Sequence, residues 1–260
     1  LHNVFFNTQC TRLVIVYSKS FFCIGVFAQL VDGTLGMGYG ATSTSFLLAY
    51  GIPPAISSTG VHVAEMFTTG ASAISHHRFG NINKKLVRHL LIPGVLGSIA
   101  GAYLLSDVID GDAIKPFIAV YMIGLAIIII RKAMQKNIIK KKTKRLNILA
   151  SFGGFMDAVG GGGWGSVVTA NLLGSGHEPR KTIGSVNAAE FFITTVTGFS
   201  FAVILGFNHW EIVAGLIVSG MLMAPISAKI LSKFPIKPLM AFVGSLIIIL
   251  SSVVIYKSIF

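Results

Sequence analysis

Long apolar stretches, separated by short polar connections, dominate the pattern of this chain. Roughly 20 apolar residues are needed to cross a bilayer as a helix. Backbone in lipid must satisfy its own hydrogen bonds, and the strict alternation typical of a barrel is absent, so the stretches predict helices. The pattern therefore predicts an all-α polytopic membrane protein with about 8–10 membrane segments. The stretches are 13–31, 41–50, 56–75, 86–105, 114–130, 146–158, 166–174, 183–205, 212–231 and 239–256.

Two of these stretches, 41–50 and 166–174, are too short to cross a bilayer. Each follows a glycine cluster, DGTLGMGYG at 32–40 and DAVGGGGWG at 157–165. Glycine destabilises a helix, and irregular backbone at membrane depth is tolerated only where it lines a protein cavity. Both clusters are therefore predicted to break the helices that contain them. The first stretch is interpreted as a retained membrane segment over 13–30, because it lacks the small-residue cleavage site of a signal peptide.

Composition supports the membrane assignment. Only 12% of the 260 residues are charged, 53% are hydrophobic, and the mean hydropathy is +0.77. A soluble domain is about 25% charged, so no separate soluble catalytic domain is expected. The net charge of +12 comes from basic residues in short runs, chiefly 76–89 and 131–145. Such runs are typical of cytoplasmic loops, so we expect a multi-pass protein of the cell (inner or plasma) membrane, with lipid and not nucleic acid as its partner.

The chain contains an internal duplication. An offset of 125 residues aligns 32–69 with 157–194 without gaps, with fourteen identities in 38 positions. The matched pairs include Asp32 with Asp157, Glu65 with Glu190, and Thr44 with Thr169. The predicted organisation is a first transmembrane repeat (1–135), a basic cytoplasmic linker (136–145) and a second transmembrane repeat (146–260).

Lys and Arg counts bear on the relative orientation of the repeats. If each half has a re-entrant hairpin and three full spans, the repeats are inverted, and 17 basic residues face the cytoplasm against 4 outside. If the broken segment crosses once, the repeats are parallel and the count falls to 15 against 6. Positive-inside bias favours the inverted arrangement. The basic groups at 180–181 and 229–237 decide the comparison.

Broken helices at matching positions of two repeats are typical of a secondary transporter with a site near the bilayer midplane. Freed N–H groups and helix N-termini favour an anion there. The alternative is that glycines only permit close helix packing, as at Gly97 and Gly101. The predicted substrate-binding residues lie at the two breaks and on the helices beside them: Gly38, Tyr39, Gly40, Thr44, His62, Gly163, Trp164, Gly165, Thr169 and Asn187. Further hydroxyl and amide groups follow at Thr42, Ser43, Ser45, Ser166 and Asn171.

Four acidic residues, Asp32, Glu65, Asp157 and Glu190, lie in apolar surroundings and are related by the repeat. A carboxylate in a membrane costs about 2.5–3.5 kcal/mol on insertion scales, so a specific role is expected. One role is proton carriage coupled to substrate movement. The other is structural, in which the carboxylate accepts hydrogen bonds from N–H groups of the broken helix. The second suits the aspartates slightly better, and the glutamates suit both equally.

His62 is matched by Asn187 and lies one turn before Glu65. It either binds an oxyanion or carries a proton, or it is a hydrogen-bonded packing residue. The remaining histidines of this region, His76, His77 and His89, belong to the basic loop. Cys10 and Cys23 have no ligand spacing, and no hydrolase or nucleotide-binding motif occurs, so no enzyme activity, cofactor or metal is expected.

The doubled motif resembles the sulfite exporter TauE/SafE family. The copies are DGTLGMGYGATSTSFLLAYGIPP (32–54) and DAVGGGGWGSVVTANLLGSGHEP (157–179), followed by VHVAEMFTT (61–69) and VNAAEFFIT (186–194). The first copy departs from the family's glycine run at Met37 and Tyr39. This resemblance implies a permease for small sulfur-containing anions such as sulfite or organosulfonates, working as an exporter by alternating access, with proton coupling as one option. The alternatives are an anion channel and a membrane-embedded enzyme or assembly factor.

Overall fold

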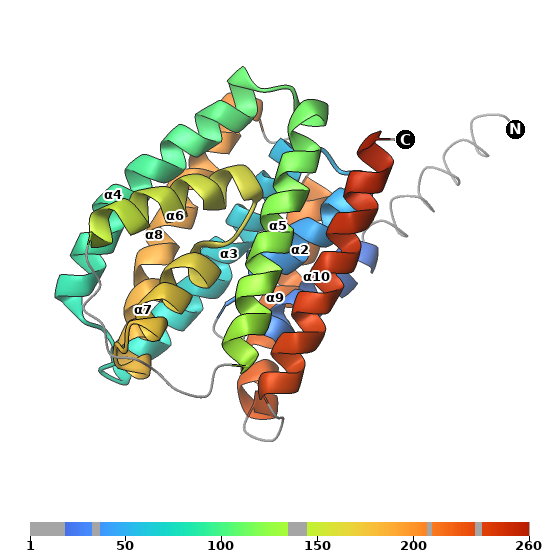
Figure 1. Cartoon of the computed structure of the whole chain (residues 1–260). Coiled ribbons are helices and arrows are strands. Elements are labelled where there is room, and N and C mark those ends of the chain that lie inside the picture. The colour runs from blue at the N-terminus through green and yellow to red at the C-terminus, as the bar shows by residue number, and fades with distance from the viewer. Residues whose placement is uncertain (1–18, 33–36, 135–144, 207–209, 232–235, 260) are drawn as a thin grey trace, which may run out of the picture.

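The computed structural model describes residues 19–32, 37–134, 145–206, 210–231 and 236–259, and all regular structure in these ranges is helical (Figure 1). The first half contains a helix over 19–32, α2 (Tyr39–Ala49), α3 (Pro54–Arg78), α4 (Lys84–Tyr103), the π-helical turn η1 (Leu104–Val108) and α5 (Gly111–Met134). The second half contains α6 (Leu146–Gly160), the π-helical turn η2 (Gly165–Thr169), α7 (Ala170–Gly174), α8 (Pro179–Leu205), α9 (Trp210–Leu231) and α10 (Ile236–Ile259).

Four stretches of the described chain are long and apolar enough to cross a membrane: Lys84–Val108, Gly111–Met134, Arg180–Leu205 and Met240–Ile259. Their apolar side chains face outward as well as inward. Phe117 on α5 is 73% exposed and Phe199 on α8 is 70% exposed, as lipid-facing residues would be. The predicted helical membrane fold is confirmed at this level. Within the predicted segment 13–30, residues 13–18 lie outside the described residues, as does 135–144, which includes most of the predicted linker.

Helices recur at the spacing of the sequence match. Pro54 begins α3 and Pro179 begins α8, 125 residues apart, and Gly111 begins α5 whereas Ile236 begins α10 at the same spacing. Proline suits the first helical position, because its missing N–H would have no partner there. The two short helices also correspond, since α2 starts at Tyr39 and the η2–α7 segment starts at Gly165.

Matched helices pack antiparallel to each other. On α3 and α8, Val63 lies against Gly198 and Gly70 lies against Phe191, so residue numbers rise on one helix as they fall on the other. At the end of this pair, Lys181 Nζ donates to the Gly80 carbonyl at 2.6 Å. Figure 1 shows α5 and α10 side by side and running in opposite directions.

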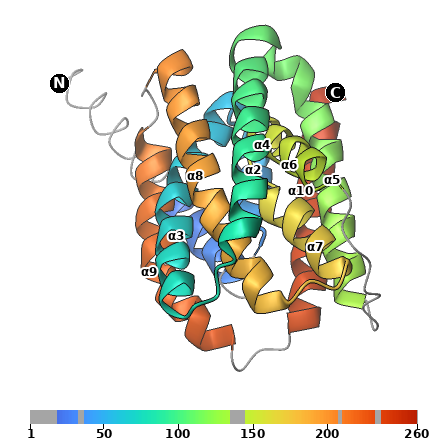
Figure 2. The same cartoon turned by 90° about the vertical axis from the view of Figure 1, so that its left-hand side faces the viewer.

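One helix of each half packs against helices of the other half. The α4 helix packs against α6 and α8 (Figure 2), and α9 packs against α3. Glycine makes the α4–α6 contact close: a Cβ on Gly101 would lie 2.5 Å from the Phe155 carbonyl oxygen, and a Cβ on Gly97 would collide with that of Ser151. The small-residue seam expected at these two glycines is confirmed.

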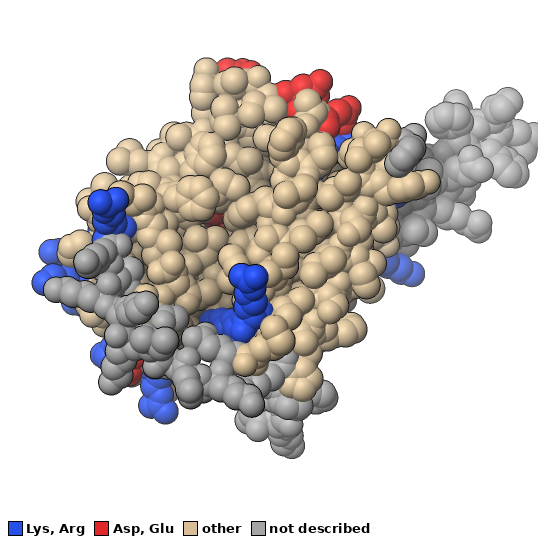
Figure 3. Space-filling model, in the orientation of Figure 1, with Lys and Arg blue, Asp and Glu red and all other residues tan. Residues whose placement is uncertain are grey.

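Charged side chains gather at opposite ends of the molecule. Figure 3 shows most Lys and Arg side chains along the lower left, where α3 ends and α8 begins, and Asp and Glu at the top, over the turn between α4 and α5. That turn exposes Asp107, Asp110 and Asp112. The surface between the two ends is largely uncharged in this view, as a bilayer-facing belt would be.

Candidate functional site

The two helix breaks meet inside the molecule. The backbone of Gly40, in the first turn of α2, lies against Gly162, in the break between α6 and η2. Gly162 and Gly163 have φ values of 138° and 140°, which L side chains rarely adopt. The Thr44 hydroxyl donates to the Gly161 carbonyl and joins the two breaks. The glycine clusters predicted to interrupt helices thus form one central contact between the halves.

At each break, an aspartate accepts a hydrogen bond from the backbone N–H of the residue seven positions later. The Trp164 N–H donates to Asp157 Oδ1 at 2.7 Å, and the matched Tyr39 N–H donates to Asp32 Oδ1 at 3.4 Å. Asp157 is 1% exposed. A carboxylate that accepts from the first N–H groups of a helix stabilises both those groups and the helix dipole. These hydrogen bonds are the ones that the structural alternative for the aspartates requires.

The two matched glutamates lie beside the N–H group that follows the aspartate-bonded one in each short helix. The Glu65 carboxylate lies close to Gly40 and interacts with its N–H, and the matched Glu190 interacts with the Gly165 N–H. The N–H groups predicted to be free for an anion therefore face the protein's own carboxylates in this structure, and those of Tyr39 and Trp164 donate to them. The sequence analysis identified the glutamates and the glycines as site residues, but it did not predict which glutamate lies beside which glycine. The assignment of these residues to substrate binding stays a prediction.

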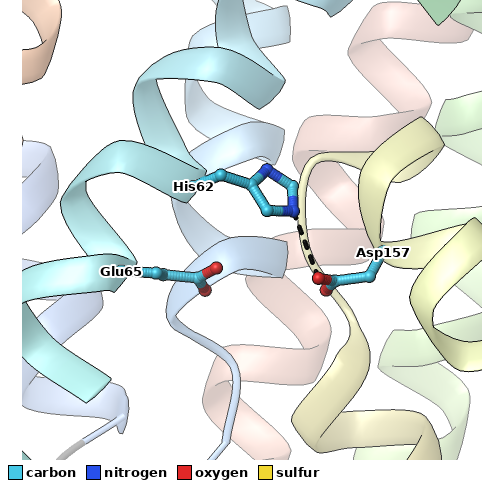
Figure 4. A group of neighbouring side chains, drawn as sticks. All are labelled: His62, Glu65 and Asp157. Atoms are coloured by element: carbon cyan, nitrogen blue, oxygen red, sulfur yellow. Dashed lines mark hydrogen bonds and ion pairs between the residues drawn. The ribbon is translucent and has the colours of Figure 1, made fainter. Parts of the chain in front are cut away.

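His62 and Asp157 bring α3 and α6 together (Figure 4). His62 Nε2 lies 3.1 Å from Asp157 Oδ2, and both side chains are almost completely buried. On the other side of the ring, Nδ1 lies 2.7 Å from the Ser58 carbonyl oxygen. The Glu65 carboxylate points toward the same space, and its Oε2 has no hydrogen-bond partner within the described chain.

One possible ligand atom each from His62, Glu65 and Asp157 falls within 4.8 Å of the others, a spacing that a metal ion would need. The nitrogen that would face such an ion is already paired with Asp157. We therefore describe the group as a hydrogen-bonded cluster and do not assign its members as metal ligands.

Buried hydroxyls without partners lie on both short helices. Within the described residues, Thr42 Oγ1 and Ser45 Oγ on α2, and Ser166 Oγ and Thr169 Oγ1 on η2, make no hydrogen bond. Each of these residues is at most 1% exposed. An unsatisfied buried polar group costs about 1–3 kcal/mol, so such a concentration indicates a place where water or a ligand completes the hydrogen bonding.

The polar atoms of three other residues predicted to bind substrate form hydrogen bonds with the protein itself. Tyr39 donates its hydroxyl to the Leu216 carbonyl at 3.2 Å, and the buried Trp164 donates its indole N–H to the Val186 carbonyl at 3.5 Å. Asn187 donates to Ser72 Oγ at 2.7 Å and so does not repeat the role of His62. The two aromatic residues, predicted to bind substrate, thus use their polar atoms on the protein backbone.

Sequence reasoning did not identify Tyr121 and did not assign Ser58 a partner. Tyr121 projects from α5 to the break, where its hydroxyl would meet a Cβ on Gly163, and this hydroxyl has no partner in the described chain. Ser58 donates its hydroxyl to the Ala158 carbonyl at 2.6 Å, next to Asp157. The available signal was a single tyrosine inside the apolar run 114–130.

The fold and site define a multi-pass helical membrane protein of the transporter class, and the comparisons with known proteins agree. Residues 21–254 match the model of the family described as sulfite exporter TauE/SafE, so the chain belongs to the TauE/SafE sulfite exporter family. The predicted resemblance is confirmed.

Two curated relatives have transporter names. The chain is 43% identical over 239 residues to the probable membrane transporter protein YtnM of Bacillus subtilis (strain 168), covering 88% of this chain and 79% of that protein. It is 28% identical over 107 residues to the probable membrane transporter protein ORF9 of Sinorhizobium sp, covering 41% of this chain and 40% of that protein. No solved structure matches the chain.

Proposed function

We propose that this protein is a secondary transporter that exports small sulfur-containing anions such as sulfite or organosulfonates. Its site lies where the breaks of α2 and of α6–η2 meet. The two halves alternate access to that site by moving against each other. Membership of the sulfite exporter family supports the substrate class. The meeting of two interrupted helices from matched positions supports the location, because transporters place substrates at such breaks.

The observation that carries this proposal is the set of partnerless hydroxyls on both short helices. Thr169, which the repeat matches with Thr44, and Ser166 come from the second half, and Thr42 and Ser45 come from the first. An oxyanion accepts several hydrogen bonds at once, and hydroxyls can donate to it without adding charge. Because the donors come from both halves, the hydrogen bonds to the bound anion depend on the relative position of the halves.

Inverted repeats suit alternating access, and the packing supports them. Two matched helices, α3 and α8, are antiparallel neighbours, as an axis in the membrane plane requires. Leu146, at the start of α6, belongs to the same apolar cluster as Leu86 in the first turn of α4, and Lys181, after α7, bonds to the Gly80 carbonyl in the turn that precedes α4. Both contacts support a re-entrant hairpin, in which the α6–η2–α7 segment would enter and leave at one end. The basic end is the cytoplasmic one.

Proton coupling follows from the charge of the site. The carboxylates of Asp32, Asp157 and Glu190 all act electrostatically on Glu65. An anion about 4 Å from an ionised carboxylate is repelled by about 4 kcal/mol at an effective dielectric constant of 20. Protons that neutralise carboxylates remove this repulsion. We therefore propose that the anion and at least one proton move together.

Uptake into proteoliposomes tests this function. With sulfite and simple alkanesulfonates as substrates, we expect saturable flux, counterflow exchange and a response to a pH gradient. Thr169→Val, which removes a partnerless hydroxyl, should reduce exchange. Thr197→Val is the matched control, because Thr197 is equally buried but donates to the Ile193 carbonyl of its own helix.

Flux that does not saturate and shows no counterflow would indicate a channel instead. Absence of flux for every sulfur oxyanion, from protein that retains its helical fold, would contradict the proposed function.

A further inference from the structure

We propose that the His62–Asp157 pair is the single proton-carrying site of this transporter. The internal repeat does not produce a second pair of this kind. This inference rests on the proposed function, in which a proton accompanies the anion. Its evidence is the hydrogen-bond geometry of the pair. It assigns the proton to one contact between the halves, formed by α3 of the first and α6 of the second.

The surroundings of His62 Nδ1 require a proton on that nitrogen. The Ser58 carbonyl oxygen, at 2.7 Å, can only accept a hydrogen bond. The Ser58 hydroxyl lies 3.2 Å from Nδ1, but its proton is donated to the Ala158 carbonyl at 2.6 Å. Both neighbours of Nδ1 are therefore acceptors. A neutral imidazole carries one proton, so in the neutral ring this proton is on Nδ1.

The contact with Asp157 then requires a second proton. With Nδ1 protonated, a neutral ring presents a lone pair at Nε2, and Asp157 Oδ2 faces it at 3.1 Å. An ionised Asp157 would place two acceptors against each other, since its Oδ1 already accepts from the Trp164 N–H. One further proton between Nε2 and Oδ2 resolves the contact. The pair is then neutral overall, either as imidazolium with carboxylate or as imidazole with carboxylic acid.

Releasing this proton changes the charge of the site by one unit. The Nε2–H···Oδ2 bridge loses its proton, and neutral imidazole and a carboxylate with a net charge of −1 remain. Both side chains are almost fully buried, so the deprotonated pair is costly beside other carboxylates. In the proposed cycle the pair holds this proton while the anion is bound and gives it up after the anion has left.

The groups around the pair supply a route for the proton. Glu65 lies one turn along α3, and its partnerless Oε2 offers an acceptor. The other titratable groups that face the centre are Tyr39 on α2, Tyr121 on α5, Glu190 on α8 and Asp32 at the end of the 19–32 helix. None of these carries a positive charge that could replace the proton of the pair.

The positions that the repeat matches to His62 and Asp157 do not form an equivalent pair. The position matched to His62 is Asn187, whose amide does not titrate and donates to Ser72 Oγ at 2.7 Å. The position matched to Asp157 is Asp32, which accepts from the Tyr39 N–H. The duplicated fold therefore repeats the helix caps but holds the titratable pair once. One anion should thus be accompanied by one proton from this pair.

Two measurements test the assignment. The first is nitrogen-15 NMR of histidine-labelled wild-type protein in lipid, with the His62 signals identified from the spectrum of His62→Asn. We expect Nδ1 protonated and Nε2 either protonated or strongly hydrogen-bonded near neutral pH. A His62 ring whose Nε2 is bare and unbonded across the stable pH range would overturn the proposal, whatever the transport activity.

The second measurement counts protons taken up per anion bound in weakly buffered solution. Methanesulfonate is the probe, because it stays ionised and does not itself take up protons. Wild type should take up one proton per anion at a pH where the empty pair is deprotonated, and this ratio should fall below one in His62→Asn. His89→Asn is the control, because His89 is exposed and bonds the Lys85 carbonyl of its own helix.

The outcomes separate the two proposals. Methanesulfonate binding with an unchanged proton ratio in His62→Asn overturns the proton assignment and leaves the proposed function intact. Absence of binding or flux for every sulfur oxyanion, with the expected NMR signals for His62, contradicts the proposed function instead. A stoichiometric metal ion in purified protein that is lost in His62→Asn would also overturn the proton assignment.

Discussion

Gly40 lies in backbone contact with Gly162, and a Cβ on Gly40 would be 2.5 Å from the Cα of Gly162. The two residues belong to different halves, and their contact joins the halves at the centre of the molecule. Glu65 also lies beside Gly40, with its Oε1 2.8 Å from the position of an added Cβ, so this contact and the carboxylate position depend on each other. The absence of a side chain at Gly40 is therefore a requirement of the site.

Gly40→Ala should damage both stability and transport. The added methyl would lie 2.5 Å from the Gly162 Cα and 2.8 Å from Glu65 Oε1, and backbone cannot move aside as a flexible side chain can. Overpacking of this kind costs about 1–3 kcal/mol. Thermal unfolding in detergent and uptake in proteoliposomes measure the two effects.

Gly124→Ala on α5 is the matched control, since no heavy atom lies within 4 Å of the added methyl. This control should be neutral, or stabilising by up to about 1 kcal/mol, because alanine favours a helix over glycine. If both variants behaved alike, the close contact of the two breaks would not be a feature of the protein in a membrane.

The two matched aspartates should differ in their effect on stability. Asp157→Ala leaves the Trp164 N–H and the His62 ring without their partner, whereas Asp32→Ala removes only one long hydrogen bond. Each orphaned buried group costs about 1–3 kcal/mol, so the Asp157 variant should unfold at the lower temperature. Circular dichroism during heating provides the comparison.

Asp112→Ala is the control for the loss of a carboxylate. Asp112 is exposed, and within the described residues its carboxylate pairs with Lys115 alone, at 2.6 Å, so its loss should cost less than about 1 kcal/mol. Equal unfolding temperatures for the Asp32 and Asp157 variants would show that the repeat imposes equal roles on both positions.

Much of the fold was predictable because the duplication repeats its helix signals. The predicted short segments 41–50 and 166–174 correspond to α2 and to η2 with α7, and the aligned prolines mark the starts of α3 and α8. Glycine clusters in a membrane segment have few structural meanings, so the breaks could be located as well. The bounds of these two short segments shifted by at most two residues, whereas those of the longer helices shifted by up to four.

The pairings inside the site were not predictable, for a physical reason. A repeat alignment shows which residues are equivalent, but contacts between the halves join residues that are not equivalent, such as His62 and Asp157. The aspartates and glutamates were identified as a group, yet their division among successive N–H groups of the short helices depends on how the breaks meet. The free N–H groups expected for an anion are consequently occupied.

Accessibility of single cysteines should place the basic end in the cytoplasm. In a background with Cys10 and Cys23 changed to serine, Glu178→Cys lies beside Arg180 and Lys181, and Asp110→Cys lies at the acidic end. Both original side chains are exposed. An impermeant thiol reagent added to intact cells should label Asp110→Cys, and it should label Glu178→Cys only after permeabilisation. The reverse pattern, or labelling of both from outside, would contradict the proposed topology.

Glutamine at the matched glutamates should separate substrate movement from proton movement. Glu65→Gln and Glu190→Gln keep the size of the side chain and an oxygen for the Gly40 or Gly165 N–H. They remove the negative charge and the capacity to take up a proton. If Glu65 accepts the proton from the His62–Asp157 pair, Glu65→Gln should retain counterflow exchange, which needs no net proton movement, and lose accumulation driven by a pH gradient.

The position matched to His62 is Asn187, so the repeat does not place a histidine before Glu190 as it does before Glu65. Glu190→Gln should therefore reduce accumulation less than Glu65→Gln does, although both lose the same charge. If the glutamates serve only to hold the short helices, both variants should instead lose folding yield and exchange together, because an amide oxygen accepts a weaker hydrogen bond than a carboxylate. Exchange and pH-driven uptake measured on the same vesicles distinguish these cases. Undiminished pH-driven uptake in both variants would remove the glutamates from the coupling mechanism and leave the proton with the His62–Asp157 pair alone.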